Sequence, residues 1–335
     1  MVNKLTYLDY KRDIIMIKWG IIGLGNIAMR FAKSLSYTNE GKLYAIASKT
    51  KDKRDSFYEQ YNCDKVYEDY YKLLNDEEID AVYIALPHGL HKYWSIEALR
   101  NKKAVLCEKP VGLNAEEMEE IKKEVYLNNT FFMEAMKTRF IPLIHNIKEI
   151  IKNGEIGEIT TIEANFCNHV TDIKQGSYLL DKEQGGALLD VGVYPLSFVM
   201  DMMDSEVQQV KSHMKINEAG VDSYFKAILT FKNGVIGTIE GAIDRNKERT
   251  AIINGTKGYI EIPIYNRPDK VIVNLNNGES YKIEKELEFD DMYAEIKEVH
   301  DCLKELKLES EHLSLNESIR VMETLDEIRK TATLN

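Results

Sequence analysis

Three side chains from two separate segments have the types and spacing for acid–base chemistry. Lys109 lies between Glu108 and Pro110, directly after a strand-like apolar run, while Asp190 and Tyr194 are four residues apart and share one face if their segment is helical. A tyrosine, whose pKa is about 10 in solution, becomes a useful acid or base when a cation lowers that pKa. Lys109 is the cation that this sequence offers, so the three residues predict a site of proton transfer.

Each of these two segments also has a simpler interpretation. Taken alone, the triplet at 108–110 fits a surface loop better than a site, and the helix from about Ala187 fits a core helix with an incidental polar pair. Pro110 additionally allows a cis peptide bond that would aim Lys109. The chemical interpretation therefore depends on what else the sequence contains.

A glycine-rich turn predicts a site for a pyrophosphate. The segment GLGNIA at 23–28 follows an apolar run and opens a helix. In that context Gly23 permits the tight turn, Gly25 lets the backbone approach the anion, and the free amides at Asn26 and Ile27 face it. An ordinary glycine turn is the less favoured alternative, given the strand and helix on either side.

The end of the second predicted strand bears on which dinucleotide would bind. A site that prefers NAD usually has an Asp or Glu there for the ribose 2′-hydroxyl, and this chain has none. Ser48 and Lys49, with Lys51, would instead receive a 2′-phosphate, which favours NADP over NAD. A solvated lysine cluster that opens a helix is the alternative.

His88 and His91 have HxxH spacing, but a metal site would need more ligands nearby. We therefore predict no metal, because a loop at the end of a strand explains both histidines. His169 is either a pocket residue or an exposed loop histidine, and the stretch 171–184 is a candidate lid.

The first part of the chain alternates short apolar runs with helical segments, which predicts a doubly wound parallel sheet. The expected strands are Ile17–Gly23, Leu43–Ser48, one near Val66, Ala81–Leu86, Ala104–Cys107 and Phe131–Glu134. The expected helices begin near Asn26, Asp52, Asp69, His91 and Asn114, the last with a capping box completed by Glu117. A helix from Pro142 to Asn153 would link this domain to the next.

After Ile159 the pattern changes to alternating strands with tight turns at Asn233-Gly234 and Asn277-Gly278, which predicts a mostly antiparallel sheet. The expected strands are Ile159–Asn168, Val207–Ile216, Tyr224–Phe231, Val235–Ile243, Arg249–Asn254, Tyr259–Ile264, Val271–Leu275 and Tyr281–Lys285. Two helices close the chain, one over about 290–306 and one capped by Ser314 with Glu317.

Composition excludes several classes of protein. With 44 basic and 55 acidic residues the chain of 335 residues has a net charge of −11, and no basic patch argues for nucleic acid. The apolar runs are too short to span a membrane, and no export signal is visible. The four cysteines are scattered without metal or disulfide spacing, which fits reduced thiols in the cytoplasm.

Taken together, these motifs resemble the Gfo/Idh/MocA oxidoreductase family over nearly the whole chain. The segments that carry the resemblance are GLGNIA at 23–28, IALPH at 84–88 with His91 beyond it, CEKP at 107–110, Glu134 to Pro142 with Arg139-Phe140, and GGALLDVGVYP at 185–195. The similarity is greatest to the dihydrodiol dehydrogenase and glucose–fructose oxidoreductase branch, which has Tyr where inositol dehydrogenases have His. It implies a Rossmann domain, expected at 16–137, and an α/β substrate domain with a large, mostly antiparallel open sheet, expected at 138–335, after an extension at 1–15.

The resemblance also implies roles. Tyr194 would donate or accept the proton, Lys109 would orient the substrate and lower the pKa of Tyr194, and Asp190 would position the substrate or the lysine. Leu86, Pro87, His91 and Glu108 would line the nicotinamide side, and Arg139 and Asn168 join Asp190 and Tyr194 as expected substrate residues. One departure is Met136-Lys137-Thr138, which replaces more aromatic residues before Arg139 and leaves the substrate open.

The resulting expectation is an NAD(P)-dependent enzyme that moves a hydride between nicotinamide and a hydroxyl-bearing carbon of a sugar or polyol-like molecule. A non-catalytic nucleotide-binding regulator of the same fold is the rival, and a tightly bound cofactor recycled between two substrates is a variant. The broad sheet face favours a homodimer or homotetramer, and the last helix is a candidate for packing back on the first domain.

Overall fold

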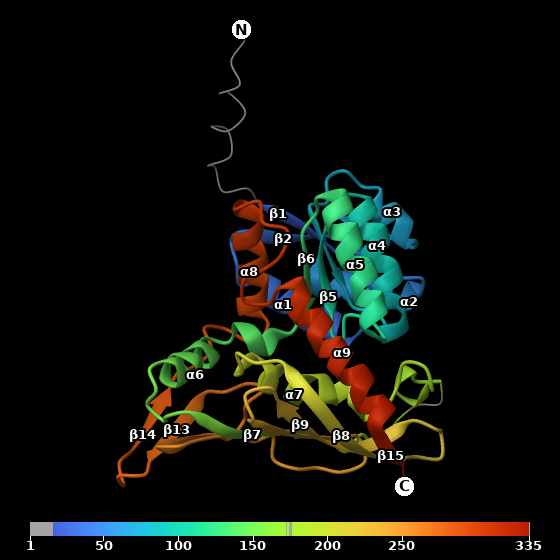
Figure 1. Ribbon diagram of the computed structural model, residues 1–335. Coiled ribbons are helices and arrows are strands. Elements are labelled where there is room, and N and C mark those ends of the chain that lie inside the picture. The colour runs from blue at the N-terminus through green and yellow to red at the C-terminus, as the bar shows by residue number, and fades with distance from the viewer. Residues whose placement is uncertain (1–15, 172, 174–175, 335) are drawn as a thin grey trace.

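A six-stranded parallel sheet forms the first domain (Figure 1). The computed structural model describes residues 16–171, 173 and 176–334, so the extension expected at 1–15 lies outside the described residues. The strands run in the order β3-β2-β1-β4-β5-β6, the doubly wound order expected from the alternating pattern. They are β1 (Ile17–Ile22), β2 (Gly41–Ala47), β3 (Lys65–Tyr67), β4 (Ala81–Ile84), β5 (Ala104–Glu108) and β6 (Phe132–Ala135).

Helices cover both faces of this sheet, and they begin close to where the sequence predicts. They are α1 (Asn26–Leu35), α2 (Lys51–Tyr61), α3 (Tyr70–Leu74), α4 (His91–Arg100) and α5 (Ala115–Asn128). The Asn114 side chain caps α5 by accepting from the Glu117 amide at 3.0 Å. The other half of the predicted capping box is wrong. The Glu117 carboxylate accepts from the Leu113 amide at 2.8 Å and not from the Asn114 amide.

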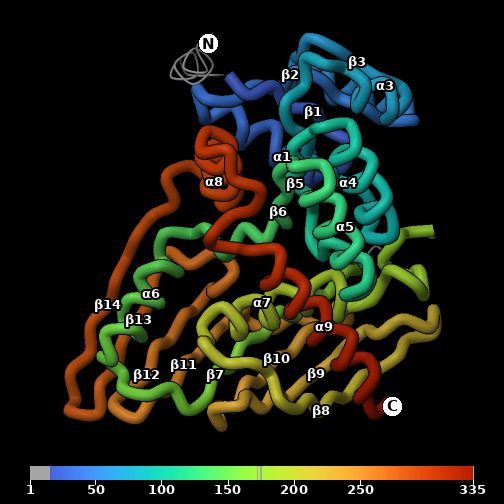
Figure 2. Tube along the Cα trace, turned by 45° about the horizontal axis from the view of Figure 1, so that its top comes forward, coloured from blue at the N-terminus to red at the C-terminus, as the bar shows by residue number. Residues whose placement is uncertain are grey.

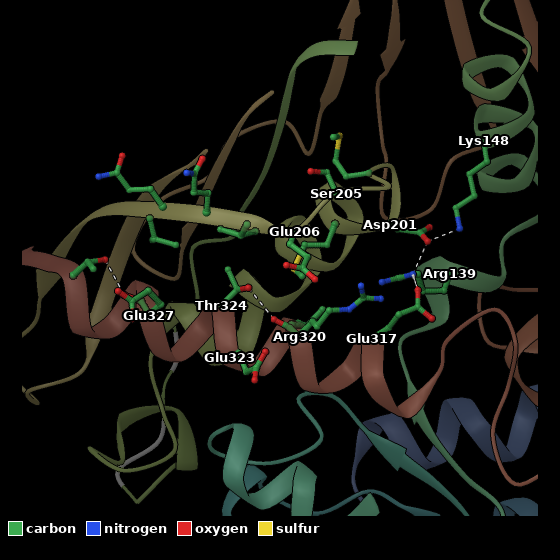
Figure 3. A pocket seen from close by; sticks show the side chains of 18 residues that line it. Arg139, Lys148, Asp201, Ser205, Glu206, Glu317, Arg320, Glu323, Thr324 and Glu327 are labelled. Atoms are coloured by element: carbon green, nitrogen blue, oxygen red, sulfur yellow. Dashed lines mark hydrogen bonds and ion pairs between the residues drawn. The ribbon is translucent and has the colours of Figure 1, made fainter. Parts of the chain in front are cut away.

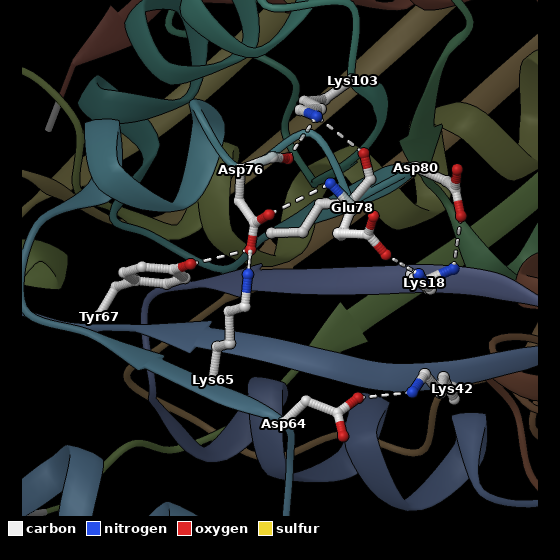
Figure 4. Close-up of polar contacts among 10 residues, drawn as sticks. Lys18, Lys42, Asp64, Lys65, Tyr67, Asp76, Glu78, Asp80 and Lys103 are labelled. Atoms are coloured by element: carbon white, nitrogen blue, oxygen red, sulfur yellow. Dashed lines mark hydrogen bonds and ion pairs between the residues drawn. The ribbon is translucent and has the colours of Figure 1, made fainter.

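Polar contacts tie together the amino-terminal ends of the parallel strands, opposite the edge where doubly wound folds bind ligands (Figure 4). The buried Lys103 ammonium donates to the carbonyls of Asp76 and Ile79 at 2.7 and 2.8 Å. The Asp76 carboxylate in turn accepts from Lys65 at 2.9 Å and from Tyr67 at 2.8 Å. These bonds satisfy a buried cation and fix the start of β5, the strand that leads into Lys109.

A nine-stranded mixed sheet forms the second domain, in the order β14-β13-β12-β11-β7-β10-β9-β8-β15. Its neighbours pair antiparallel except β7 with β10 and β8 with β15, so the predicted mostly antiparallel sheet is confirmed. The strands are β7 (Ile159–Cys167), β8 (Val207–Ile216), β9 (Asp222–Phe231), β10 (Ile236–Ala242), β11 (Ala251–Gly255), β12 (Gly258–Ile262), β13 (Lys270–Leu275), β14 (Ser280–Glu284) and β15 (Ala332–Leu334). The sequence analysis missed β15, a strand of three residues.

Helices lie on the face of this sheet that is turned toward the first domain (Figure 1). They are α6 (Pro142–Lys152), with Pro142 in its first turn as expected, and α7 (Val193–Asp201), which is preceded by a π-helical turn, η4 (Leu188–Gly192). The sheet's other face has no covering helix in Figures 1 and 2. On that face β9 exposes Ile228 and β12 exposes Tyr259.

The chain then returns to the first domain through two helices, α8 (Tyr293–Lys304) and α9 (Leu315–Thr331) (Figure 2). Helix α8 packs on α1, and His300 accepts from the Trp19 indole at 2.9 Å inside the core. Helix α9 packs on α5, and its Ser318 hydroxyl donates to Glu134 at 2.8 Å. The predicted capping box of α9 is confirmed. No helix in the described part of the chain is long and apolar enough to cross a membrane.

Candidate active site

The glycine-rich turn has the geometry of a phosphate cradle. Gly23 has φ +91°, and a Cβ there would lie 2.4 Å from the Ala85 carbonyl oxygen, so only glycine fits. A Cβ on Gly25 would meet no protein atom within 4 Å, because that position faces open space. The first amides of α1 have no acceptor within the helix and point the same way. These residues fit the pyrophosphate of a dinucleotide.

A cavity of about 700 Å³ extends from this turn along the carboxyl ends of the parallel strands to the second domain. It contains most of the residues expected at the cofactor and proton-transfer sites. These are Gly23, Gly25, Asn26, Ile27, Ser48, Lys49, Leu86, Pro87, Glu108, Lys109 and Tyr194.

Lys109 and Tyr194 line the inner end of this cavity, and Asp190, which does not line it, contacts Lys109 from behind. The Lys109 ammonium donates to the Asp190 backbone carbonyl at 2.6 Å and lies 3.5 Å from the Asp190 carboxylate. It also lies 5.0 Å from the centre of the Tyr194 ring. The Lys109-Pro110 peptide bond is cis. The structure therefore brings two distant segments into one cluster around a cation.

The helix that carries Asp190 and Tyr194 is not regular, and the expected α-helix from Ala187 is wrong in its first turn. Residues 188–192 form the π-helical turn η4. Gly192 there has no room for a side chain, since a Cβ would lie 2.6 Å from the Phe225 ring. Asp222, at the start of β9, accepts from the Leu188 amide at 2.6 Å and holds the amino end of the turn.

The protonation of the cluster follows from burial and charge. Burial raises the pKa of Tyr194 to about 12, while Lys109 acts in the lowering direction. Burial lowers the pKa of Lys109, but Tyr194, Asp190 and Glu108 together raise it above its usual value. Lys109 lowers the pKa of Tyr194 as expected, but burial raises that pKa by more. At neutral pH Tyr194 is a neutral phenol beside a charged ammonium, which is the state of a proton donor.

The two histidines of the HxxH segment do different things. His88 lines the cavity, and burial lowers its pKa to about 3, so its ring is neutral. His91 is buried behind the cavity wall, where its ring nitrogens lie 2.7 Å from the carbonyl oxygens of Pro110 and Leu86. His91 thus supports the two cofactor-facing loops rather than lining the site as expected. Among the described residues no cluster of His, Cys, Asp or Glu is placed to hold a metal.

Arg139, expected at the substrate, lies elsewhere (Figure 3). It is 3% exposed and lines a separate cavity between α9 and β8. Its guanidinium donates to Ser197 at 3.0 Å and forms ion pairs with Asp201 at 2.5 Å and Glu317 at 3.1 Å. Two carboxylates neutralise this buried cation, so its observed role is to join α7 and α9.

Other residues of the cavity were missed by the sequence analysis or lie just behind it. Asn168 does not line the cavity but accepts from the Arg249 guanidinium at 3.1 Å. Tyr178 does line it, and its hydroxyl lies 3.3 Å from the Asp190 carboxylate. Tyr178 belongs to the stretch predicted as a lid, and Lys137 was noted only as a departure from the family pattern. Cavity residues that the sequence analysis did not single out include Arg30, Phe166, Arg249, Asn266 and Arg267.

The outer end of the cavity carries the groups expected near the adenosine ribose. Lys49 lines it together with Lys53, a residue in the first turn of α2 that the sequence analysis did not single out. Lys51 points elsewhere and pairs with Asp55 at 2.5 Å. The signal that would have found Lys53 was its place in the first turn of the helix that follows the second strand, next to Lys49 at that strand's end.

The doubly wound domain, the phosphate cradle and the lysine–tyrosine pair define a two-domain, dinucleotide-dependent oxidoreductase. Residues 17–135 match the oxidoreductase family with an NAD-binding Rossmann fold, and residues 144–261 match the GFO/IDH/MocA C-terminal domain. The chain belongs to the Gfo/Idh/MocA oxidoreductase family, and NADP or NAD fits its Rossmann domain.

Relatives agree with this membership, and solved structures share the fold. The chain is 31% identical to trans-1,2-dihydrobenzene-1,2-diol dehydrogenase of Mus musculus over 94% of this chain and 96% of the relative, and 30% identical to that of Homo sapiens with the same coverage. A 3-ketoreductase from Actinomadura kijaniata in complex with NADP and TDP-benzene has a TM-score of 0.87 at 24% identity, covering 95% and 98% of the two chains. Levoglucosan dehydrogenase in complex with NADH and levoglucosan has a TM-score of 0.85 at 20% identity, covering 94% and 96%.

Proposed function

We propose that this enzyme transfers a hydride between a nicotinamide dinucleotide and a hydroxyl-bearing carbon of a sugar or polyol-like molecule, with Tyr194 moving the proton. The observation that carries the proposal is the Lys109 ammonium, held between Asp190 and the Tyr194 ring in the cavity that begins at the phosphate cradle. The names of the relatives, a diol dehydrogenase, a ketoreductase and a sugar dehydrogenase, support the same class of substrate.

When bound, the nicotinamide supplies or accepts the hydride. In the reducing direction Tyr194, neutral at physiological pH, donates its phenolic proton to the carbonyl oxygen of the substrate. Lys109 stabilises the phenolate that this leaves, and Asp190 holds Lys109 in place. In the oxidising direction the same phenolate accepts the hydroxyl proton.

We also propose NADP as the preferred cofactor. Lys49 and Lys53 line the outer end of the cavity, and Ser48 lies beside them with no acidic residue in its place. Two ammonium groups would attract a 2′-phosphate, whereas a carboxylate would repel it.

The remaining expectations concern the assembly and its surroundings. We propose a homodimer or homotetramer formed through the open face of the second sheet, where Ile228 and Tyr259 are exposed. The four cysteines are separate, buried thiols, which supports work in a reducing compartment such as the cytoplasm.

The test combines cofactor binding, by NADPH and NADH fluorescence, with turnover of a sugar and polyol panel by wild type and Tyr194→Phe. We expect NADPH to bind both proteins equally, and the turnover of one substrate to fall about 10²–10⁴-fold in the variant. Cofactor binding without any turnover would favour the non-catalytic regulator. Turnover only when two substrates are supplied together would indicate a tightly bound, recycled cofactor.

A further inference from the structure

Positive charge collects at the inner end of the cavity, where the substrate of the proposed reaction would lie. Five cations are placed there, namely Arg30, Lys109, Lys137, Arg249 and Arg267. The carboxylates in or directly behind the same walls are Glu108, Asp190 and Asp291. The buried Glu295 lies nearby, and burial raises the pKa of its carboxyl well above the usual value, which disfavours its charged form.

One carboxylate serves three of these cations. Asp291 forms ion pairs with Lys137 at 2.5 Å and with Arg267 at 2.5 Å, and also with Arg30. Its single negative charge cannot neutralise all three. Part of the positive charge therefore remains available to a bound anion.

Arg249 has no carboxylate partner within the described part of the chain. Its guanidinium lies over the Phe166 ring, 4.2 Å from its centre, and donates to the neutral Asn168 side chain. Phe166 in turn packs against Tyr194, with ring centres 5.2 Å apart. Burial and the charge of Arg267 lower the pKa of Arg249, as expected for a cation that lacks a compensating anion. Arg249 is thus held near Tyr194, and no carboxylate of the described residues neutralises its charge.

A backbone hydrogen bond and a buried amide complete this wall. The Tyr265 amide donates to the Arg249 carbonyl at 3.1 Å, which joins the turn after β12 to the segment before β11. Asn266, next in that turn, lines the cavity and is 2% exposed, yet its side-chain oxygen has no partner among the described residues. The unpaired amide oxygen can accept a hydrogen bond from a substrate hydroxyl, and the Arg249 guanidinium in the same cavity has no anionic partner among the described residues.

We infer that the substrate carries an anionic group, a carboxylate or a phosphate, which binds between Arg249 and Arg267 while its reacting hydroxyl faces Tyr194. This inference rests on the proposed function and narrows its substrate to acidic polyols. The guanidinium forks of two arginines match a carboxylate or phosphate in geometry as well as charge. Lys137, which also lines the cavity, adds a third basic side chain, although burial lowers the pKa of its ammonium and Asp291 pairs with it.

The test compares substrates with and without an acidic group, with saturating NADP so that the 2′-phosphate site is filled. In the carboxylate arm, D-glucuronate and gluconate are compared with D-glucose. In the phosphate arm, glucose 6-phosphate and glycerol 3-phosphate are compared with D-glucose. We expect at least one acidic arm to be turned over with a lower KM than its neutral counterpart. In Arg249→Met, KM for that substrate rises about 10- to 100-fold with little change for the neutral one. Arg249→Lys restores part of the difference.

Arg245→Met is the matched control. Arg245 lies in the same loop and its guanidinium is also 4.2 Å from a ring centre, that of Tyr224, but it pairs with Asp244 outside the cavity. This variant is expected to behave as wild type. Neutral substrates turned over as well as acidic ones, with Arg249→Met affecting both alike, would overturn the inference and leave the proposed function standing.

A binding measurement separates the inference from the proposed function. Inorganic phosphate, added to the NADP complex, is expected to raise the Tm of wild type and of Arg245→Met but not of Arg249→Met. If nothing is turned over but this pattern appears, the anion site stands and the proposed reaction fails. If Arg249→Met instead loses affinity for NADP itself, the arginine belongs to the cofactor and the inference is overturned.

Discussion

Tyr194 is subject to two opposing effects, because burial favours the neutral phenol and the Lys109 ammonium favours the phenolate. The balance between these two effects sets the pKa of the Tyr194 hydroxyl, whose proton moves in the proposed reaction. Replacing Lys109 changes that balance without touching the phenol itself.

Lys109→Met is expected to raise the pKa of Tyr194 further. Alcohol oxidation needs the phenolate, so its kcat/KM rises with pH, and in the variant this rising limb moves up by about one pH unit or more. Because the pKa of Tyr194 is about 12, both limbs are still rising at pH 10, and the shift is read as the displacement along the pH axis of log(kcat/KM), measured between pH 7 and pH 10 for both proteins. A limb at the same pH in both would show that Lys109 does not act on the Tyr194 proton.

Lys53→Ala is expected to weaken NADPH binding about 5- to 10-fold and to leave NADH binding within about twofold, because only the 2′-phosphate would lose a partner. Titration of cofactor fluorescence measures both. Lys51→Ala serves as the control, since the Lys51 ammonium pairs with Asp55 away from the cavity. Equal weakening of NADPH and NADH would contradict the assignment.

Residue types and spacing predicted which residues of the first domain line the cavity. Gly23 and Lys109 each follow a strand of the parallel sheet, and the carboxyl ends of such strands meet at one edge. Arg249 and Arg267 precede or follow strands of the mixed sheet, and their meeting depends on how that sheet pairs. No local spacing carries that information, so the second wall of the cavity could not be predicted.

Elements were predicted better than the irregularities within them. The helix with Asp190 and Tyr194 was expected, but its π-helical turn depends on Phe225 and Asp222, which approach from a neighbouring strand. Similarly, Arg139 was expected at the substrate. In the 3-10 helix Lys137–Phe140, however, Lys137 lines the cofactor cavity and Arg139 lines the separate cavity between α9 and β8. Tertiary packing decides both outcomes.

Asp222→Asn tests the anchor of this turn through pH. Burial raises the pKa of Asp222 to about 6, so its folded-state pKa lies above that of the unfolded chain, which is about 3.9. Its contribution to stability is therefore complete below about pH 4 and is lost as the pH rises through 6. The Asn side chain can still accept from the Leu188 amide and has no charge to desolvate.

We expect the free energy of unfolding of Asp222→Asn, relative to wild type, to increase by about 2 kcal/mol between pH 4.5 and pH 7.5. Urea unfolding at both pH values measures it. Asp244→Asn is the control, because Arg245 holds the pKa of Asp244 below its usual value and the sign is reversed. A pH-independent difference for Asp222→Asn would refute the account.

In the whole molecule, the uncovered face of the nine-stranded sheet is the surface on which the proposed assembly depends. Ile228→Lys places a charge on that face, where Ile228 of β9 is 41% exposed, and is expected to shift the protein toward monomers. Light scattering after size-exclusion chromatography measures the mass. Leu127→Lys, on α5 and 79% exposed, is the control. A monomeric wild type, or an unchanged oligomer in the variant, would exclude this face as the interface.

The return of α8 and α9 to the first domain also sets the order in which the protein can mature on the ribosome. Trp19 and its partner His300 are separated by 281 positions. At a synthesis rate of about 5–20 residues per second, His300 is therefore added roughly 15 to 55 seconds after Trp19. Until then the surfaces of α1 and α5 that receive these helices are bare. A nascent or truncated chain that ends before Tyr293 therefore presents apolar helix faces to chaperones and to its neighbours, even though its nucleotide-binding turn is already made.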